Sequence, residues 1–156
     1  MAATAPREPV THATFRVERS YPTPPARVFA AFANPATKRR WFAEGEGWEV
    51  DEFTLDFRIG GRETSRFRFR GGPPMGNDTI FLDIVPERRI VLAYTMTVAN
   101  TPISVSLATV ELAPSGDGTT LIYTEQGAFF DGADKASLRE AGCRVLLEQL
   151  AAELAS

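Results

Sequence analysis

Residues 119–156 read TTLIYTEQGAFFDGADKASLREAGCRVLLEQLAAELAS, and the hydrophobic pattern changes within them. Residues 119–126 form a short run rich in β-branched and aromatic side chains between turn-forming residues, which is typical of a strand. The stretch from Ala133 to Leu154 contains no proline and one internal glycine, Gly142, and predicts a long helix. Its apolar stripe requires a sheet to pack on and consists of Leu138, Ala141, Val145, Leu146, Leu150 and Leu154.

Short strand-like runs fill the chain upstream of this segment. Glycine, proline and asparagine separate them at 60–61, 71–77, 85–89, 100–102 and 114–118. Consecutive short strands of this kind predict an antiparallel meander. The runs number six or seven, according to whether the first two are separate, and cover residues 48–53, 55–59, 62–70, 79–85, 90–98, 104–112 and 119–126.

The first part of the chain predicts a tail, a strand and two short helices. Residues 1–10 are small, polar and proline-containing, and we expect a flexible tail there. Period-two alternation predicts a strand that begins near Thr11. Thr23 precedes two prolines and is the expected N-cap of one helix, and residues 35–42 predict a second.

Composition limits the class of protein. A length of 156 residues with 44% hydrophobic and 24% charged side chains fits one globular domain, which we expect over residues 11–156. The formal net charge of −3 lacks the basic excess of a nucleic-acid binder, so no nucleic-acid partner is expected. No apolar run is long enough to span a bilayer, so stable membrane insertion is not expected either.

Two single residues limit the chemistry. Cys143 is the one cysteine, so no intramolecular disulfide can form and a cytoplasmic location is expected. His12 is the one histidine and lies beside the tail, which argues against a catalytic triad, a cysteine–histidine pair or a zinc site. No cofactor or metal is therefore indicated, and we expect Cys143 to be a buried structural thiol.

Landmarks of a known family are spread over the chain from Thr11 on. They are Phe15-Arg16-Val17-Glu18-Arg19, Arg27-Val28-Phe29-Ala30-Ala31-Phe32, Asn34-Pro35 before Arg40-Trp41-Phe42, Asp56-Phe57-Arg58-Ile59-Gly60-Gly61-Arg62, Val85-Pro86-Glu87-Arg88-Arg89-Ile90-Val91 and Gly118-Thr119-Thr120-Leu121. In this order the sequence resembles the SRPBCC (START-like) superfamily, in the branch related to the C-terminal domain of the activator of heat-shock-protein-90 ATPase. The resemblance implies an α+β helix-grip fold: a curved antiparallel sheet, two short helices after strand one, and a long C-terminal helix packed across the sheet.

The same resemblance implies an internal apolar cavity between sheet and last helix. Two positions depart from the branch: Gly142-Cys143 stands where relatives often have Gly-Trp, which would widen the cavity, and Glu63 stands where they often have an aromatic residue. Strand alternation and the helix stripe give the expected lining, with core packing as the alternative role for each residue. The candidate residues are Trp41, Phe42, Glu63, Phe67, Phe69, Tyr94, Met96, Tyr123, Glu125, Cys143, Leu146 and Leu147.

The polar members of this set are the informative ones. Burial would disfavour the ionised form of Glu63 or Glu125 and suit it to acid–base chemistry or to binding a ligand's amine or hydroxyl. The alternative is that these carboxylates lie near the cavity mouth or pair with an arginine such as Arg62 or Arg66. For Tyr94 and Tyr123 the alternative is that the hydroxyl reaches solvent or a backbone carbonyl.

Three functions remain open, because members of this superfamily share a fold more than an activity. The favoured one is binding of a small hydrophobic ligand in the cavity. The second is a protein-interaction role like that of a co-chaperone, but a chaperone partner is not expected, since the chain has no room for the N-terminal domain that such activators use. The third is a cyclase- or hydratase-type enzyme with Glu63 or Glu125 as general base, which is less favoured. A homodimer through the outer sheet face or a strand edge is compatible with each.

Overall fold

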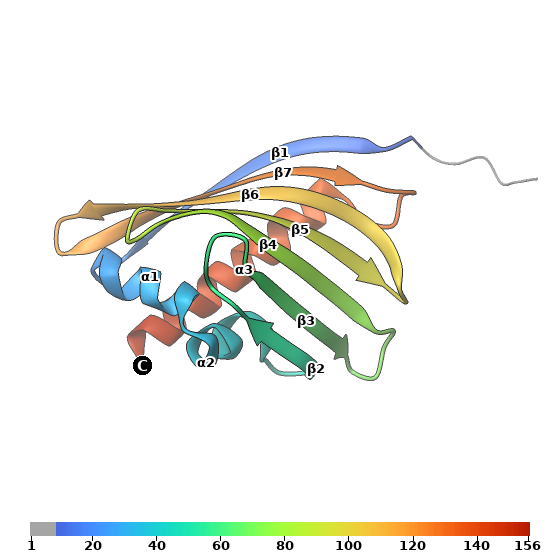
Figure 1. The fold of residues 1–156 in the computed structure, drawn as a ribbon, viewed down its shortest axis with the longest axis horizontal. Helices are drawn as coiled ribbons and strands as arrows, with labels where there is room; N and C mark the ends of the chain where they lie inside the picture. Colours follow the sequence, from blue (N-terminus) through green and yellow to red (C-terminus); the bar gives the residue numbers. More distant parts are fainter. Residues whose placement is uncertain (1–8) are drawn as a thin grey trace, which may run out of the picture.

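A computed structural model describes residues 9–156, so the tail expected at residues 1–10 lies almost wholly outside the described residues. Seven strands form one antiparallel sheet in the order β1-β7-β6-β5-β4-β3-β2, and a long helix lies across one face (Figure 1). The strands are β1 (Thr11–Tyr21), β2 (Trp48–Leu55), β3 (Arg62–Phe69), β4 (Met75–Val85), β5 (Arg89–Val98), β6 (Thr101–Ser115) and β7 (Gly118–Phe129). The helical elements are α1 (Pro25–Ala33), α2 (Pro35–Lys38), the π-helical turn η1 (Arg39–Ala43) and α3 (Ala136–Ala155).

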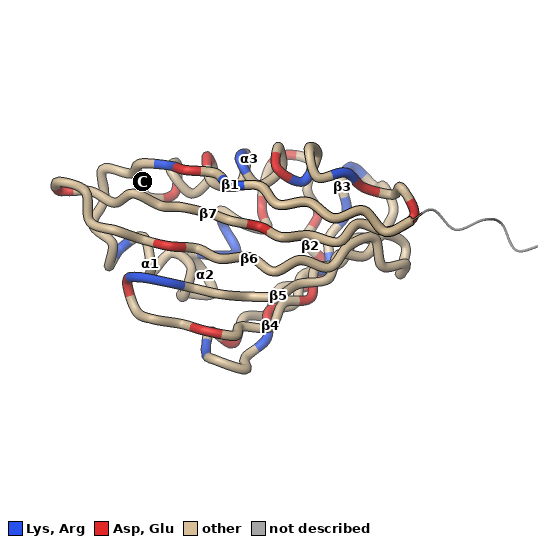
Figure 2. Tube along the Cα trace, turned by 90° about the horizontal axis from the view of Figure 1, so that it is seen from above, with Lys and Arg blue, Asp and Glu red and all other residues tan. Residues whose placement is uncertain are grey.

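The curved antiparallel sheet with two short helices after strand one and a C-terminal helix confirms the predicted helix-grip class. Strands β2 to β7 form the expected meander, and β1 pairs with β7 along its whole length from Thr11 to Tyr21. The chain between β1 and β2 therefore connects the two edges of the sheet, and α1, α2 and η1 lie in that connection. Figure 2 shows β1, β7, β6, β5 and β4 side by side, with acidic and basic residues interspersed along them.

Contacts with distant segments decide two details of the local structure. The runs 48–53 and 55–59, left open as one strand or two, give the single strand β2, so six strands follow the short helices. β2 ends at Leu55, and the following loop is held by the bond from the Gly60 amide to the Phe81 carbonyl. Thr23 is not the N-cap of α1, which Pro24 occupies without a side-chain cap. The Thr23 carbonyl instead accepts a 2.6 Å hydrogen bond from the Thr119 hydroxyl of β7.

The face that α3 turns to the core also differs from the predicted stripe. Its buried residues are Cys143, Leu147, Leu150 and Leu154, whereas Leu138 and Val145 of the predicted stripe are 63% and 57% exposed. At about 100° per residue, Leu138 and Val145 lie on another side of the helix from Leu147. The prediction merged two apolar faces of one helix into a single stripe.

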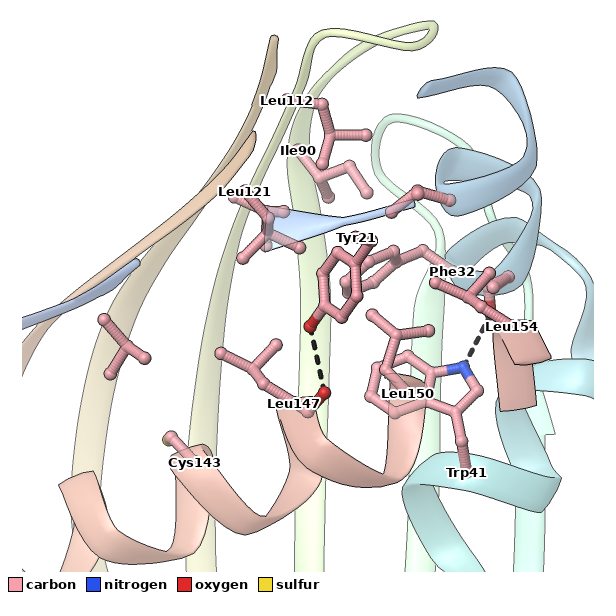
Figure 3. Packing of buried hydrophobic residues seen from close by; sticks show 14 of the residues in the cluster. Tyr21, Phe32, Trp41, Ile90, Leu112, Leu121, Cys143, Leu147, Leu150 and Leu154 are labelled. Atoms are coloured by element: carbon pink, nitrogen blue, oxygen red, sulfur yellow. Dashed lines mark hydrogen bonds between the residues drawn. The ribbon is translucent and has the colours of Figure 1, made fainter. Parts of the chain in front are cut away.

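Two buried hydrogen bonds hold the helical elements in place, one between the sheet and α3 and one between η1 and α1 (Figure 3). The hydroxyl of Tyr21, at the end of β1, donates to the backbone carbonyl of Leu147 at 2.9 Å. The indole Nε1 of Trp41 donates to the carbonyl of Ala31 at 2.9 Å, so η1 is tied to α1. Both donors are buried, and each side chain contributes apolar packing as well as a satisfied polar group.

Candidate functional site

A pocket of about 620 Å³ lies between the inner face of the sheet and α3. We call it the α3 pocket. Leu138, Gly142 and Val145 lie on its α3 wall, so the helix face that avoids the core borders the pocket instead. Predicted cavity residues that lie on its walls are Trp41, Phe42, Glu63, Phe67, Tyr94, Met96, Tyr123, Cys143, Leu146 and Leu147.

Two predicted cavity residues lie elsewhere. Phe69 ends β3 and is 43% exposed, with its ring 4.8 Å from the ring of Trp48, because the strand has run past the pocket by that point. Glu125 is fully buried but is not on the pocket wall, since the side chains that bind it stand between it and the space. Strand alternation predicted that both residues face inward. It assigns a residue to one face of the sheet but does not tell whether the side chain borders the pocket.

Glu125 is the centre of a buried polar cluster, which we call the Glu125 cluster. Its Oε2 accepts hydrogen bonds from the Tyr94 hydroxyl at 2.7 Å and the Ser106 hydroxyl at 2.8 Å. Its Oε1 accepts from the Tyr123 hydroxyl at 2.5 Å and, weakly, from the Cys143 thiol at 3.7 Å. Each of these groups donates a hydrogen bond, and the two oxygens of a carboxylate have enough lone pairs to accept all of them.

Arg139 closes the cluster from α3. Its guanidinium lies 3.3 Å from Glu125 Oε2 and donates to Tyr94 at 2.8 Å, to Ser104 at 2.7 Å and to Asp134 at 2.7 Å. The side chain of Arg139 is largely buried, so these ion pairs are shielded from solvent. Arg139 lies outside the apolar stripe predicted for this helix, and no local signal distinguishes it from the exposed Arg144.

Burial controls the protonation of the groups around Glu125. Desolvation, with the Glu125 charge as the second cause, raises the pKa of the Cys143 thiol to about 12. Burial also raises the pKa of Tyr123 and of Tyr94 well above the ordinary value of a phenol. All three groups therefore stay protonated at neutral pH, and Cys143 is a hydrogen-bond donor rather than a nucleophile.

The second buried carboxylate, Glu63, pairs with a lysine. Lys38 Nζ of α2 lies 2.9 Å from Glu63 Oε1, and the two side chains are 5% and 2% exposed. Glu63 does not pair with Arg62 or Arg66, because alternation along β3 puts them on the opposite face from Glu63. The alternative of an arginine partner holds for Glu125, which pairs with Arg139. The Lys38 ammonium also lies over the rings of Phe42, Trp41 and Phe32, at 4.5, 5.6 and 5.7 Å from their centres.

Strand register connects the Lys38–Glu63 pair to the Glu125 cluster across the sheet. Glu63 of β3 is the partner of Thr79 on β4, Thr79 of Tyr94 on β5, and Tyr94 of Ser106 on β6. We call these four residues the polar row. A neighbouring row runs Ser65, Asn77, Met96, Ser104 in the same way. The serines, threonine and asparagine were not predicted, because small polar residues are common in strands and nothing distinguishes these until the register aligns them.

Within residues 9–156, no three or more histidine, cysteine, aspartate or glutamate side chains are placed to hold a metal ion. Over the same residues, no helix has both the length and the apolar character needed to cross a membrane.

Several solved structures are similar to this chain in both sequence and fold. The solved structure of the Mll3558 protein from Rhizobium loti has 58% sequence identity to this chain and a TM-score of 0.87, with 94% of this chain and 99% of the other covered. An uncharacterised protein from Rhizobium leguminosarum has 38% identity and a TM-score of 0.91, with 96% and 98% covered. Protein CV1439 from Chromobacterium violaceum has 28% identity and a TM-score of 0.75, with 90% and 96% covered.

The sequence also matches one family along most of its length. No curated protein matches the chain. The family described as Activator of Hsp90 ATPase homolog 1-like protein matches residues 22–155, from the end of β1 to the last turn of α3. That range contains both buried carboxylates and every wall of the α3 pocket. The chain therefore belongs to the family of Activator of Hsp90 ATPase homolog 1-like proteins.

Proposed function

We propose that this protein binds a small hydrophobic molecule in the α3 pocket. The observation that carries the proposal is the pocket itself: about 620 Å³ between sheet and helix, walled mainly by apolar side chains with a few buried polar groups among them. Ligand sites in proteins are typically concave, mostly apolar and of this size, with few polar groups that set orientation.

The exposed apolar residues of α3 support the same proposal. Leu138 and Val145 are large, solvent-exposed and border the α3 pocket, although the helix has a separate buried face for the core. A structural helix needs only the face that packs on the sheet. Apolar side chains beside a pocket mouth suit an apolar molecule that enters there.

A binding role agrees better with the carboxylates than a catalytic one does. A general base needs a lone pair within reach of the substrate proton. Glu125 accepts from Tyr94, Ser106 and Tyr123 and does not lie on the pocket wall, and Glu63 is held by Lys38. Both carboxylates serve the protein's own polar groups, which favours a preformed binding site.

Gly142 provides the sharpest test of where the molecule binds. It lies on the pocket wall in the middle of α3, and a Cβ built on it meets no heavy atom within 4 Å. A Gly142→Trp side chain therefore has room to enter the mouth of the pocket. The matched control is Gly142→Ala, which adds one methyl group and raises helix propensity by about 1 kcal/mol.

The probe is N-phenyl-1-naphthylamine, an uncharged dye whose fluorescence increases in apolar surroundings. We expect saturable binding to the wild-type protein and to Gly142→Ala, and at least about tenfold weaker binding to Gly142→Trp, with the same far-ultraviolet circular dichroism in all three. Equal binding by Gly142→Trp would overturn the assignment to the α3 pocket. Failure of the wild-type protein and Gly142→Ala to bind would overturn the proposed function.

A further inference from the structure

Ser65 is a buried polar residue on the wall of the α3 pocket. It lies on β3 between Glu63 and Phe67, which share its inward face and also border the pocket. Its exposed fraction is 1%. Among the described residues, its Oγ is the buried side-chain polar atom that has no hydrogen-bond partner.

The neighbours of Ser65 are committed to other bonds. Glu63 accepts from Lys38 at 2.9 Å, and the hydroxyl of Thr79 donates to Asn77 Oδ1 at 2.9 Å. A buried hydroxyl without a partner destabilises a protein by about 1–3 kcal/mol. Alanine would fill nearly the same space without that penalty, so the hydroxyl of Ser65 is not explained by folding.

We infer that Ser65 is the residue with which the α3 pocket selects its ligand, by a hydrogen bond to a hydroxyl or carbonyl oxygen on an otherwise apolar molecule. This inference rests on the proposed function and names the class of ligand. A serine hydroxyl both donates and accepts, so it fits either a hydroxyl or a carbonyl group. Phe67, Leu92 and Met96 around the same space provide apolar contacts for the body of the molecule.

The charges near Ser65 favour an uncharged ligand. Lys38 and Glu63 neutralise one another at 2.9 Å, and both are nearly fully buried. A charged group bound beside Ser65 would lose its hydration without gaining a free counter-ion, which is strongly unfavourable in a low-dielectric pocket. A neutral hydroxyl or carbonyl group has no such penalty and satisfies the one unpaired atom.

The polar row limits the dimensions of the molecule. Strands in a sheet lie about 4.8 Å apart, so Glu63 on β3 and Tyr94 on β5 are separated by about 10 Å along the sheet. A two-ring compound fits between the Lys38–Glu63 pair and the Glu125 cluster. 4-Phenylphenol and biphenyl form a suitable probe pair, because they differ only in one hydroxyl group.

The first experiment measures both compounds by displacement of N-phenyl-1-naphthylamine from the wild-type protein, Ser65→Ala and Thr64→Ala. Thr64→Ala is the matched control, since Thr64 precedes Ser65 on β3 and faces the other side of the sheet. We expect 4-phenylphenol to bind the wild-type protein and Thr64→Ala about five- to tenfold more tightly than biphenyl, the effect of one net hydrogen bond. In Ser65→Ala this ratio should fall to about one, with biphenyl affinity unchanged.

The second experiment measures thermal unfolding without any added compound. Ser65→Ala should unfold at a higher temperature than the wild-type protein, because it removes an unpaired buried hydroxyl. A lower midpoint would show that the hydroxyl has a structural partner and would overturn the inference. An unchanged selectivity ratio in Ser65→Ala would overturn it too, while the dye binding that supports the proposed function would remain; loss of all binding by the wild-type protein would overturn both.

Discussion

Lys38 Nζ on α2 and Glu63 Oε1 on β3 lie 2.9 Å apart, in one of the least exposed ion pairs of the described residues. The pair joins the helical connection to the sheet at the wall of the α3 pocket. Its partners are 25 residues apart in sequence, and both charges have been removed from water. Loss of one member of such a pair is expected to destabilise the protein strongly, whereas the intact pair adds little net stability over two apolar residues.

Replacing one member of this pair should therefore be far more harmful than replacing both. We expect Lys38→Met and Glu63→Leu each to lower the free energy of unfolding by about 3–5 kcal/mol, because each leaves a buried charged group without its partner. The double variant Lys38→Met/Glu63→Leu should recover most of that loss. Urea unfolding of the four proteins measures this, with the half-exposed pair Arg66–Asp78 as a control worth less than about 1 kcal/mol. Additive effects of the two single substitutions would contradict the expectation.

Glu125→Gln should destabilise the protein although it preserves shape. The amide replaces an oxygen that accepts with a nitrogen that donates, so it faces donors such as Tyr123 and leaves Arg139 less well paired. We expect a loss of about 2–4 kcal/mol in the free energy of unfolding by denaturant titration. Glu111→Gln, on the exposed face of β6, is the matched control and should change it by less than about 0.5 kcal/mol. A loss at Glu125 as small as that at Glu111 would refute the role of the Glu125 cluster.

The three tyrosines predict a cooperative loss of stability at alkaline pH. Burial raises the pKa of Tyr21 to about 12 and raises the pKa of Tyr94 and Tyr123 as well, whereas in the unfolded chain each has a pKa near 10. Between about pH 10 and pH 12 the unfolded chain releases protons that the folded chain retains, so stability is complete below pH 10 and falls as the pH rises.

Absorbance at 295 nm and circular dichroism, followed together against pH, test this directly. Tyrosine absorbance should stay flat through pH 10 and then rise at the same pH at which the circular dichroism is lost. A tyrosine that ionises near pH 10 in a protein with intact circular dichroism would contradict the burial of these hydroxyls. Tyr21→Phe, which also removes the bond to the Leu147 carbonyl, should lower the absorbance rise to that of the two remaining tyrosines and make the fall in stability with pH less steep.

Cys143 should react slowly in the native protein. Burial raises the pKa of its thiol to about 12, so very little thiolate is present at pH 8. Modification by 5,5′-dithiobis(2-nitrobenzoic acid) should be at least about 100-fold slower in buffer than in denaturant, with the unfolded protein as internal control. Rapid native modification would mean that the thiol is accessible and activated, which would reopen a chemical role for it.

The fold was predictable because local periodicity is set by chain neighbours. The alternation of Phe15 and Val17, the turn glycines and the proline-free segment before Leu154 are each recorded within a few residues, and they predict a meander followed by a helix. The predicted start of a helix was wrong where a distant segment decided it: the expected N-cap Thr23 instead accepts a hydrogen bond from Thr119 at its carbonyl. The prediction of the buried face of α3 was wrong for a related reason. Two apolar faces of one helix are equivalent in the sequence, and only packing against the sheet decides which one is buried.

The sequence by itself determined the class of fold, the family, and the inward facing of Glu63, Tyr94, Tyr123 and Glu125 from strand alternation. Only the tertiary structure decided their partners. The path of α2 places Lys38 beside Glu63, and the rotation of α3 about its axis places Arg139 beside Glu125. Strand register aligns one row across the sheet, formed by Glu63, Thr79, Tyr94 and Ser106. These contacts join residues far apart in the chain. A buried polar group is stable only when its partners are buried with it, and no local pattern of residues encodes which partners those are.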